Sequence, residues 1–271
     1  MRILIITMDD PVQTNSFIKK IIENKHNDII GIAITKKDRL SIKKGNSKVK
    51  YILSLLLIMG LSQFIKNSFI ILSYKFKKKI NHLLPTFVKD PSLKDVAKKY
   101  NIRTWEIQTP NNKNFLEEIS TLEIDIIINQ SQNILKKDLL SIPKIGIINR
   151  HNALLPKNRG RLTPFWVLYN DEKETGVSIH FVTEELDAGD IIVQKKINID
   201  KNDNFNSLVK KNYELAPIAM LEAIDKLEEG FKNFIPNSKE KATYNTTPTF
   251  REAFEYRKKR LKKFIKNLLS Y

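Results

Sequence analysis

Cysteine is absent from the 271 residues, and tryptophan and glycine are scarce, with two and eight occurrences. Without cysteine the chain has no disulfide, no thiolate metal ligand and no cysteine nucleophile, a composition that fits a reducing compartment. The motif G-x-G-x-x-G does not follow the first apolar run, so dinucleotide binding through that motif is unsupported. Unbroken apolar runs of about 20 residues, which a membrane-spanning helix needs, are also missing.

Acidic residues are fewer than basic ones, 30 against 47, which gives a formal net charge of +17. This charge suits an anionic partner such as a nucleic acid, a nucleotide sugar, a folate polyglutamate or an acidic lipid. Lysine, asparagine and isoleucine are frequent throughout, so we favour compositional bias as the main cause. Basic residues cluster most clearly at 36–50 and 257–266.

Nearly continuous apolar runs alternate with amphipathic segments, which is typical of a parallel sheet covered by helices on both faces. Strands are predicted at 2–8, 28–35, 104–107, 124–129, 145–149, 176–182 and 191–199. Helices are predicted at 12–24, 114–120, 164–170, 204–229 and 249–269. The pattern predicts an α/β fold, with a main domain over 1–200 and a C-terminal helix and extension over 201–271.

Residues 51–88 depart from this alternation, because they combine two apolar stretches with a lysine cluster behind them. Gln63, Lys66 and Asn67 interrupt the apolar residues and leave runs too short to span a membrane. We predict an inserted helical hairpin that packs on the domain or on a partner subunit. The alternatives are peripheral contact with a membrane interface, since basic residues flank the apolar ones, and the lining of a substrate entrance.

Three polar side chains carry the chemistry that the sequence suggests. Asn149 and His151 are two positions apart, so on an extended segment they point to the same side. Asp187 follows 36 positions later, on a turn before another apolar strand. An amide, an imidazole and a carboxylate in one place can stabilise an oxyanion and move a proton, as acyl transfer requires. Each alone is more often a cap, turn or structural residue.

The sequence motifs around these residues narrow the set of possible functions. Four motifs occur in order: Asn149-x-His151-x3-Leu155-Pro156-x2-Arg159-Gly160, Pro164-x-Trp166, Thr175-Gly176-Val177-Ser178-Ile179-His180 and Leu186-Asp187-Ala188-Gly189-Asp190. With these motifs the chain resembles the formyltransferases that use 10-formyltetrahydrofolate, closely over 124–199 and loosely over 1–35. The resemblance implies a Rossmann-like formyltransferase domain.

The resemblance also implies roles for individual residues. Asn149 and His151 would stabilise the oxyanion formed when an amine attacks the formyl carbon, and Asp187 would orient His151 and receive the amine proton. It implies 10-formyltetrahydrofolate as the co-substrate and no metal. The folate is expected on the loop at 129–135 and the turn near Asp187, and we predict these contacts: Gln130, Ser131, Asn133, Ile134 and Asp190. Arg159 and Gly160 are predicted to contact the acceptor substrate, and His180 is interpreted as structural.

Three acceptors compete within the family. Methionyl-tRNA formyltransferases carry a C-terminal barrel that needs roughly 70–100 residues, whereas 26 residues follow Asn245. Glycinamide ribonucleotide formyltransferases usually lack the Arg-Gly-x3-Pro-x-Trp motif. The chain is most similar to the sugar N-formyltransferases, which modify nucleotide-linked amino sugars for surface polysaccharides such as the lipopolysaccharide O-antigen. Their extension, like the Tyr244-x3-Pro248 tail here, takes part in dimerisation.

The same resemblance implies a cytoplasmic protein that forms a homodimer. Membrane association through residues 51–88 stays an open alternative. Nucleic acid is not expected as a partner. The alternative to an enzyme is a protein that has a degenerate transferase core and binds membranes or nucleic acids. The intact set of Asn149, His151 and Asp187 argues against that degeneracy.

Overall fold

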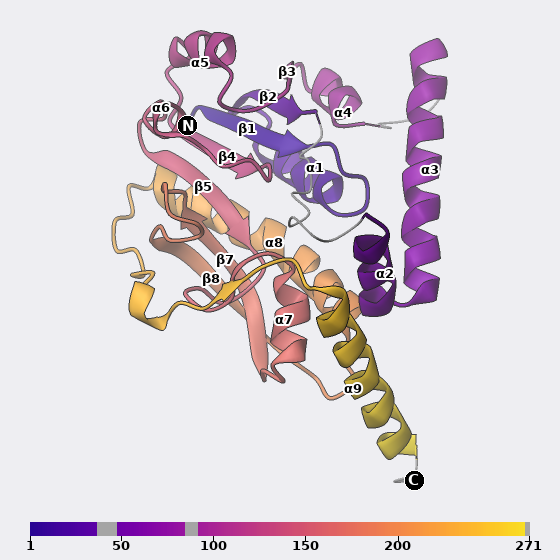
Figure 1. Ribbon diagram of the computed structural model, residues 1–271. Helices are drawn as coiled ribbons and strands as arrows, with labels where there is room; N and C mark the ends of the chain where they lie inside the picture. The colour runs from indigo at the N-terminus through magenta and orange to yellow at the C-terminus, as the bar shows by residue number, and fades with distance from the viewer. Residues whose placement is uncertain (37–47, 85–91, 269–271) are drawn as a thin grey trace.

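A seven-stranded sheet organises the computed structural model, which describes residues 1–36, 48–84 and 92–268. The strand order is β3-β2-β1-β4-β5-β7-β8 (Figure 1). The first five of these strands in sequence pair in parallel, and β7 and β8 join antiparallel at one side. The strands are β1 Ile3–Met8, β2 Ile29–Thr35, β3 Arg103–Ile107, β4 Ile126–Gln130, β5 Gly146–His151, β7 Glu174–Phe181 and β8 Ile191–Asn198. The predicted α/β fold with a mostly parallel sheet is confirmed.

Two apolar layers cover the sheet, one on each face. The larger one holds α1 (Thr14–Lys25), α4 (Leu93–Lys99) and the long α8 (Phe205–Glu228) against side chains such as Ile5 and Ile148. The other packs α5 (Lys113–Ser120) and the short α6 (Lys137–Leu140) against alternate side chains such as Leu4 and Ile147. Because both faces are covered, the central strands are apolar at consecutive positions rather than at every second one.

The predicted inserted hairpin consists of two helices, α2 (Lys48–Met59) and α3 (Leu61–Leu83), joined at Gly60. The chain turns sharply there, and the two helices are bent by 117°. Gly60 has a φ of +81°, a left-handed conformation that glycine adopts without strain. Among the described residues no single helix is long and apolar enough to cross a membrane, and only this bent pair passes such a test in combination.

A third apolar cluster joins α2 to the C-terminal part of the chain. It contains residues of α2, α7 (Thr163–Tyr169), the start of α8 and α9 (Phe250–Leu268), namely Ile58, Phe165, Trp166, Phe205, Ala253 and Tyr256. Before α9, the chain forms a short 3-10 turn at Lys239–Lys241 and the two-residue strand β9 (Tyr244–Asn245). Strand β9 pairs in parallel with β6 (Arg159–Gly160), next to the predicted active-site motif.

The structure differs from the sequence prediction mainly in short elements. The predicted strands and helices are present with ends shifted by at most two residues, and β5 extends two residues further than predicted, through His151. The sequence did not predict α4, α6, β6 or β9, which have between two and seven residues. Part of the predicted insertion, residues 85–88, lies outside the described residues, as does most of the basic group at 36–50. The division into domains at residue 200 stays a prediction.

Candidate active site

Strand β5 places Asn149 and His151 on the same face of the sheet, as the two-residue spacing predicted. Asn149 is aligned with Asn129 on β4 and with His180 on the antiparallel neighbour β7. Directly opposite residues of an antiparallel pair share a face, so His180 lies on the face that carries Asn149 and His151. Arg150 points the other way, where its guanidinium lies against the rings of Phe17 and Tyr213, with its carbon 4.6 and 4.3 Å from the ring centroids.

The side-chain amide of Asn149 is oriented by its neighbour on β4. Gln130 Nε2 donates a hydrogen bond to Asn149 Oδ1 at 2.9 Å and a second one to the backbone oxygen of Asn129 at 2.7 Å. Since the amide oxygen is engaged, the Nδ2 group of Asn149 is left to donate. Within the described parts of the chain it donates to no other residue. The half-buried amide therefore offers N–H groups to a ligand.

The ring of His151 is fixed by a backbone carbonyl. Nε2 lies 2.8 Å from the oxygen of Asn158, and a carbonyl only accepts hydrogen bonds, so Nε2 carries the hydrogen. The other nitrogen, Nδ1, lies 3.5 Å from Asp187 Oδ2. Nδ1 is consequently the atom of His151 that can take up a proton, and it faces a carboxylate that would stabilise the resulting imidazolium. The side chain of His151 is 7% exposed and that of Asp187 is 10% exposed, so little water screens this pair.

Asp187 reaches this position from the turn between β7 and β8. Its backbone is left-handed, with a φ of +49°, a conformation that aspartate tolerates better than most residues. Gly160 of β6 donates its backbone N–H to Asp187 Oδ2 at 2.8 Å. The other carboxylate oxygen lies 3.8 Å from Nε2 of His180. The structure thus brings together the three residues predicted as catalytic, and it adds His180.

His180 has no direct hydrogen bond to this carboxylate but shapes its surroundings. Its Nδ1 lies 2.7 Å from the backbone oxygen of Phe181, so Nδ1 carries the hydrogen and Nε2 presents a lone pair. Burial lowers the pKa of His180, because the charged ring would lose its hydration, and it outweighs the opposing pull of Asp187. A nitrogen lone pair from each of His151 and His180 therefore faces the carboxylate of Asp187.

The loop that carries Asp187 is fixed by a residue that the sequence analysis missed. Asn237 Nδ2 donates to the backbone oxygens of Asp187 and Gly189 at 2.8 and 2.9 Å. Its Oδ1 accepts from Arg159 Nη2 at 3.0 Å, and its backbone oxygen accepts from the same group at 2.9 Å. Asn237 is 8% exposed, so these bonds are shielded from water. The only sequence signal nearby was the Tyr244-x3-Pro248 tail, seven residues further on.

Arg159 is fully buried, and its guanidinium serves this network. Besides Asn237, it donates through Nη1 to the hydroxyl of Tyr244 at 2.9 Å and lies 3.5 Å from Glu185 Oε1. This placement favours a positioning role for Arg159 over the predicted contact with substrate. Gly160, predicted alongside it, has a φ of +106°, and a Cβ there would lie 2.0 Å from the oxygen of Asn245. Only glycine therefore permits the β6–β9 pairing that presents its N–H to Asp187.

The residues predicted to bind folate lie on two sides of the catalytic face. Ser131 donates to Asn129 Oδ1 through its backbone N–H and its hydroxyl, at 3.1 and 2.9 Å, which fixes the turn after β4. Asn133 continues that turn, and Ile134 is 82% exposed although it is large and apolar. Asp190 is exposed on the turn after Gly189. Gln130 is directly bonded to a predicted catalytic residue, Asn149.

Residues 1–224, more than four fifths of the sequence, match the family described as Formyl transferase. The chain belongs to the formyl transferase family. The family match includes Asn149, His151 and Asp187, whereas Asn237 and Tyr244 lie beyond it. The anchors of the Asp187 loop thus come from a part of this formyl transferase that the family match does not reach.

Individual relatives of this formyl transferase differ in what they act on. Methionyl-tRNA formyltransferase from Staphylococcus aureus (strain JH1) is 33% identical over 155 residues, which cover 57% of this chain and 50% of that protein. The chain spans about half the length of the curated relatives it matches. Among solved structures, an N-formyltransferase from Helicobacter canadensis, in complex with folinic acid and dTDP-3-aminofucose, aligns with a TM-score of 0.56 at 18% identity, over 91% of this chain and 71% of that one.

Phosphoribosylglycinamide formyltransferase from Anaplasma phagocytophilum aligns with a TM-score of 0.57 at 14% identity, over 91% of this chain and 98% of that one. At these identities the two solved structures are evidence of a shared fold. The acceptor therefore has to be inferred from the chain itself.

Proposed function

We propose that this protein transfers a formyl group from 10-formyltetrahydrofolate to the primary amine of a nucleotide-linked amino sugar. The observation that carries the proposal is the orientation of Asn149. Gln130 holds its amide oxygen, and the free Nδ2 donor lies on the strand face that also carries the His151–Asp187 pair. An N–H donor beside a proton acceptor backed by a carboxylate is the arrangement that acyl transfer to an amine uses.

The reaction follows from these groups. The amine nitrogen attacks the formyl carbon and a C–N bond forms, while the carbonyl electrons move onto oxygen, where Asn149 Nδ2 donates a hydrogen bond. The ammonium proton of the intermediate passes to the His151–Asp187 pair, at Nδ1 or through the carboxylate. The carbonyl then re-forms, the bond to the folate N10 breaks, and N10 takes a proton. The pair returns to its starting state once that proton has been delivered.

The residues after β4 suit the folate. The exposed side chain of Ile134 offers an apolar surface for an aromatic ring, next to a turn that is already fixed by Asn129 and Ser131. The backbone oxygen of Ile134 is already engaged by Asn111, so the ring's hydrogen bonds would fall to other backbone groups of the loop. Ser131, Asn133 and Asp190 are proposed as further contacts, and Gln130 as a residue that positions Asn149.

A sugar nucleotide is supported as the acceptor by the four sequence motifs, the C-terminal extension and the basic character of the chain, which suits a diphosphate. Charged initiator tRNA is the second candidate, because methionyl-tRNA formyltransferases are 33% identical over 155 residues and the net charge is +17. The proposal includes a cytoplasmic location and a homodimer formed through the extension. Analytical ultracentrifugation over a range of protein concentrations tests the dimer.

An acceptor panel tests the function. The protein would be given 10-formyltetrahydrofolate with dTDP-, UDP- and GDP-linked 4-amino sugars, with charged initiator tRNA and with glycinamide ribonucleotide, and N-formyl products would be detected by mass spectrometry. We expect turnover on one nucleotide sugar. Turnover on the tRNA alone would refute the sugar assignment, and no transfer to any amine would refute the function.

Two variants test the site itself. Asp187→Asn and His151→Ala are each expected to lower kcat by about 10²–10³, since each removes a group that stabilises the transition state, while folate binding by calorimetry is retained. Asp138→Asn and His26→Ala are matched controls, because Asp138 is exposed on α6 and His26, after α1, lies against the ring of Tyr100. Equal rates in all four variants would exclude the proposed roles.

A further inference from the structure

Helix α3 carries a row of exposed apolar side chains on its outer side. Its members are between 58% and 70% exposed, and we call them the α3 stripe: Leu61, Ile65, Phe69, Leu72, Phe76 and Leu83. At about 100° per residue, the six positions fall within a sector of about 80° that runs the length of the helix. Exposed apolar residues are ordinary when scattered, but an aligned row on one helix marks an interaction surface.

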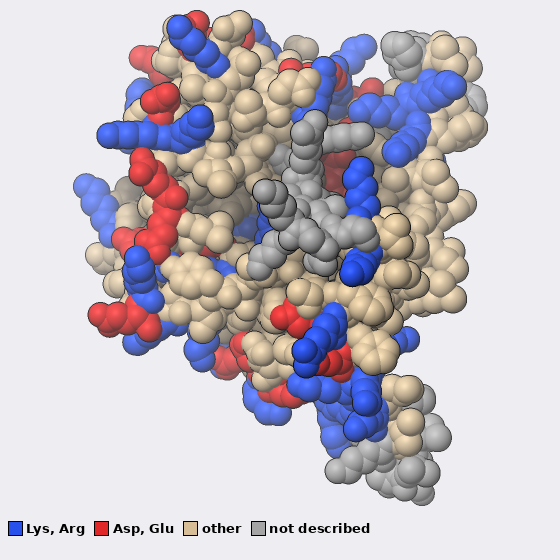
Figure 2. Space-filling view, viewed as in Figure 1, with Lys and Arg blue, Asp and Glu red and all other residues tan. Residues whose placement is uncertain are grey.

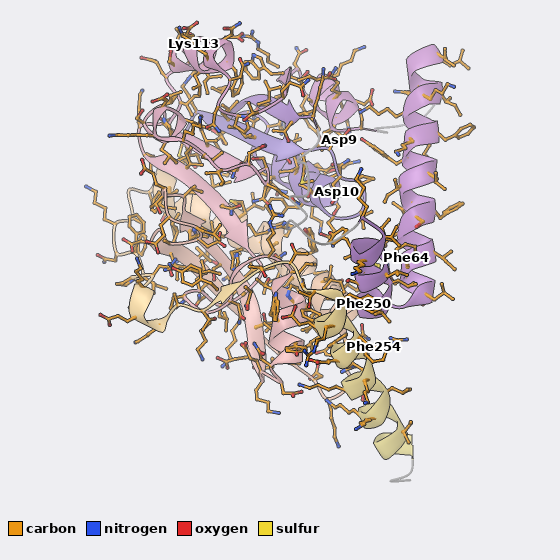
Figure 3. All side chains as sticks on the ribbon, viewed as in Figure 1. Asp9, Asp10, Phe64, Lys113, Phe250 and Phe254 are labelled. Atoms are coloured by element: carbon orange, nitrogen blue, oxygen red, sulfur yellow. The ribbon has the colours of Figure 1, made fainter. Side chains whose placement is uncertain are left out.

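The stripe is not the face by which α3 attaches to the domain. Tyr74 and Lys78 bind the carboxylate of Asp9 in the β1–α1 loop, and Asn67 Nδ2 lies 3.6 Å from the sulfur of Met59 on α2. On a helical wheel these residues lie roughly opposite the stripe. Figure 3 shows Asp9 between the end of β1 and α3. Burial disfavours the charge of Asp9, yet the bonds from Lys78 and Tyr74 hold its pKa below the usual range, so the attachment is built on a charged carboxylate.

Within α2 and α3, the charged side chains around the stripe are all lysines. The sequence of α2 and α3, residues 48–83, contains seven lysines and no aspartate or glutamate. Lys75 and Lys79 lie along one edge of the stripe and Lys66 beyond the other, by their positions on the helical wheel. Figure 2 shows a largely uncharged surface along α3, with lysines toward its upper end. An apolar row between lysines is the pattern of a helix that lies in the interface of an anionic membrane.

A second copy of the chain is a poorer occupant. The stripe from Ile65 to Phe76 has the 3–4 spacing of a coiled coil, but it continues into Lys79 and extends over about two heptads, fewer than the three or four that a stable pair needs. A self-contact would also bring lysines against lysines, with no acidic partner on either α2 or α3. An anionic bilayer supplies both the apolar layer and the negative charge.

We propose that α3 docks on the surface of an anionic lipid bilayer, with the α3 stripe in the acyl–headgroup boundary and the lysines among the headgroups. The 117° bend at Gly60 and the lysines along the helix fit a helix that lies on the surface. Asp9 follows β1, and Thr7 of β1 is aligned with Gln130 of β4, the residue that holds Asn149. The attachment of α3 and the catalytic face therefore lie at the same edge of the sheet, which docking would orient with respect to the bilayer.

Vesicle flotation tests this proposal. The full chain would be mixed with vesicles of phosphatidylcholine, or of phosphatidylcholine with phosphatidylglycerol, and the bound fraction measured across a lipid titration. We expect binding to the phosphatidylglycerol vesicles that weakens with added salt. The double variant Phe69→Ser with Phe76→Ser should lower the partition coefficient about hundredfold, roughly tenfold or 1.4 kcal/mol for each ring. Circular dichroism would confirm that the variant is folded.

Two further variants distinguish binding through the α3 stripe from non-specific hydrophobic binding and from the contribution of charge. Ile145→Ser with Ile218→Ser removes two exposed apolar side chains elsewhere, and it should leave binding unchanged. Lys66→Gln, Lys75→Gln and Lys79→Gln together should lower binding to the anionic vesicles roughly hundredfold, at about 1 kcal/mol per lysine.

Three results would overturn the proposal. The first is a wild-type protein that does not bind the vesicles at low salt. The second is a stripe variant that binds them as tightly as its control variant. The third is sedimentation data showing that the protein dimerises through Phe69 and Phe76 and does not bind lipid. Because none of these measurements depends on formyl transfer, failure here leaves the proposed function standing, and failure of the acceptor panel leaves the docking proposal standing.

Discussion

The side chain of Asn237 offers the sharpest test of how the active site is held. Asn237→Ala removes two hydrogen bonds to the backbone of the Asp187 loop and one from the guanidinium of Arg159. Neutral hydrogen bonds contribute about 1 kcal/mol each and those to charged groups about 1.5–3 kcal/mol. Water entering the vacated space will recover part of this loss, so we expect the free energy of unfolding to fall by about 3 kcal/mol.

The same variant should lose activity beyond its loss of stability. Asp187 would shift relative to His151 once its loop is released, and a displacement of about 1 Å can lower the rate about 10²-fold. Urea unfolding followed by tryptophan fluorescence gives the stability, and initial rates at a temperature where the variant stays folded separate kcat from KM. We expect the fall in kcat to exceed any change in the KM for folate.

Asn24→Ala is the matched control, because the amide of Asn24 is exposed and bonds only within α1, to the backbone oxygen of Lys20. It should change stability by less than about 0.5 kcal/mol. The reasoning would be refuted if Asn237→Ala lost less than about 1 kcal/mol and kept kcat within about twofold of the wild type.

Further predictions concern the buried histidine, the turn glycine and the attachment of α3. Because burial lowers the pKa of His180, the unfolded chain binds a proton below about pH 6.5 that the folded chain does not bind. The free energy of unfolding therefore decreases as the pH is lowered below about 6.5. In urea titrations, His180→Gln should remove up to about 1.4 kcal/mol per pH unit of that decrease. Gly189→Ala would place a Cβ 2.1 Å from the backbone oxygen of Phe181 and should cost about 1–3 kcal/mol in thermal unfolding. Tyr74→Phe removes a donor from Asp9, and faster proteolysis of α3 should report a loss of about 1–2 kcal/mol. A variant that matches wild type in its assay would contradict the corresponding contact.

Local patterns in the sequence were sufficient for the central part of the site. Asn149 and His151 share a strand, so a two-residue period places them on one face without any knowledge of the rest of the fold. Asp187 came from a motif rather than from periodicity, because a turn after one strand has no fixed direction toward another. The structure adds the reason for its position, the backbone N–H of Gly160.

Contacts between distant segments could not be predicted from the sequence. Asn237 follows Asp187 by 50 positions, and Tyr244 follows Arg159 by 85, with a 24-residue helix in between. No local propensity specifies such a pairing. His180 looked structural because it alternates with apolar residues on β7, and only the antiparallel register with β5 brings it opposite Asn149. Arg159 was predicted to contact the acceptor substrate, because the groups that accept its hydrogen bonds, on Asn237 and Tyr244, lie far along the chain and leave no local pattern.

The pairing of β6 with β9 also sets an order of events during synthesis of the chain. Arg159 leaves the ribosome long before Glu185, Asn237 and Tyr244, the residues that later surround its guanidinium. Until those residues emerge, the charge cannot be buried without a large cost, and the loop that carries Asp187 lacks the two hydrogen bonds from Asn237. A nascent chain can thus complete its central sheet before the loop that carries Asp187 is fully held. The final position of Asp187 is therefore set late in synthesis, when the segment around residues 237–245 has emerged.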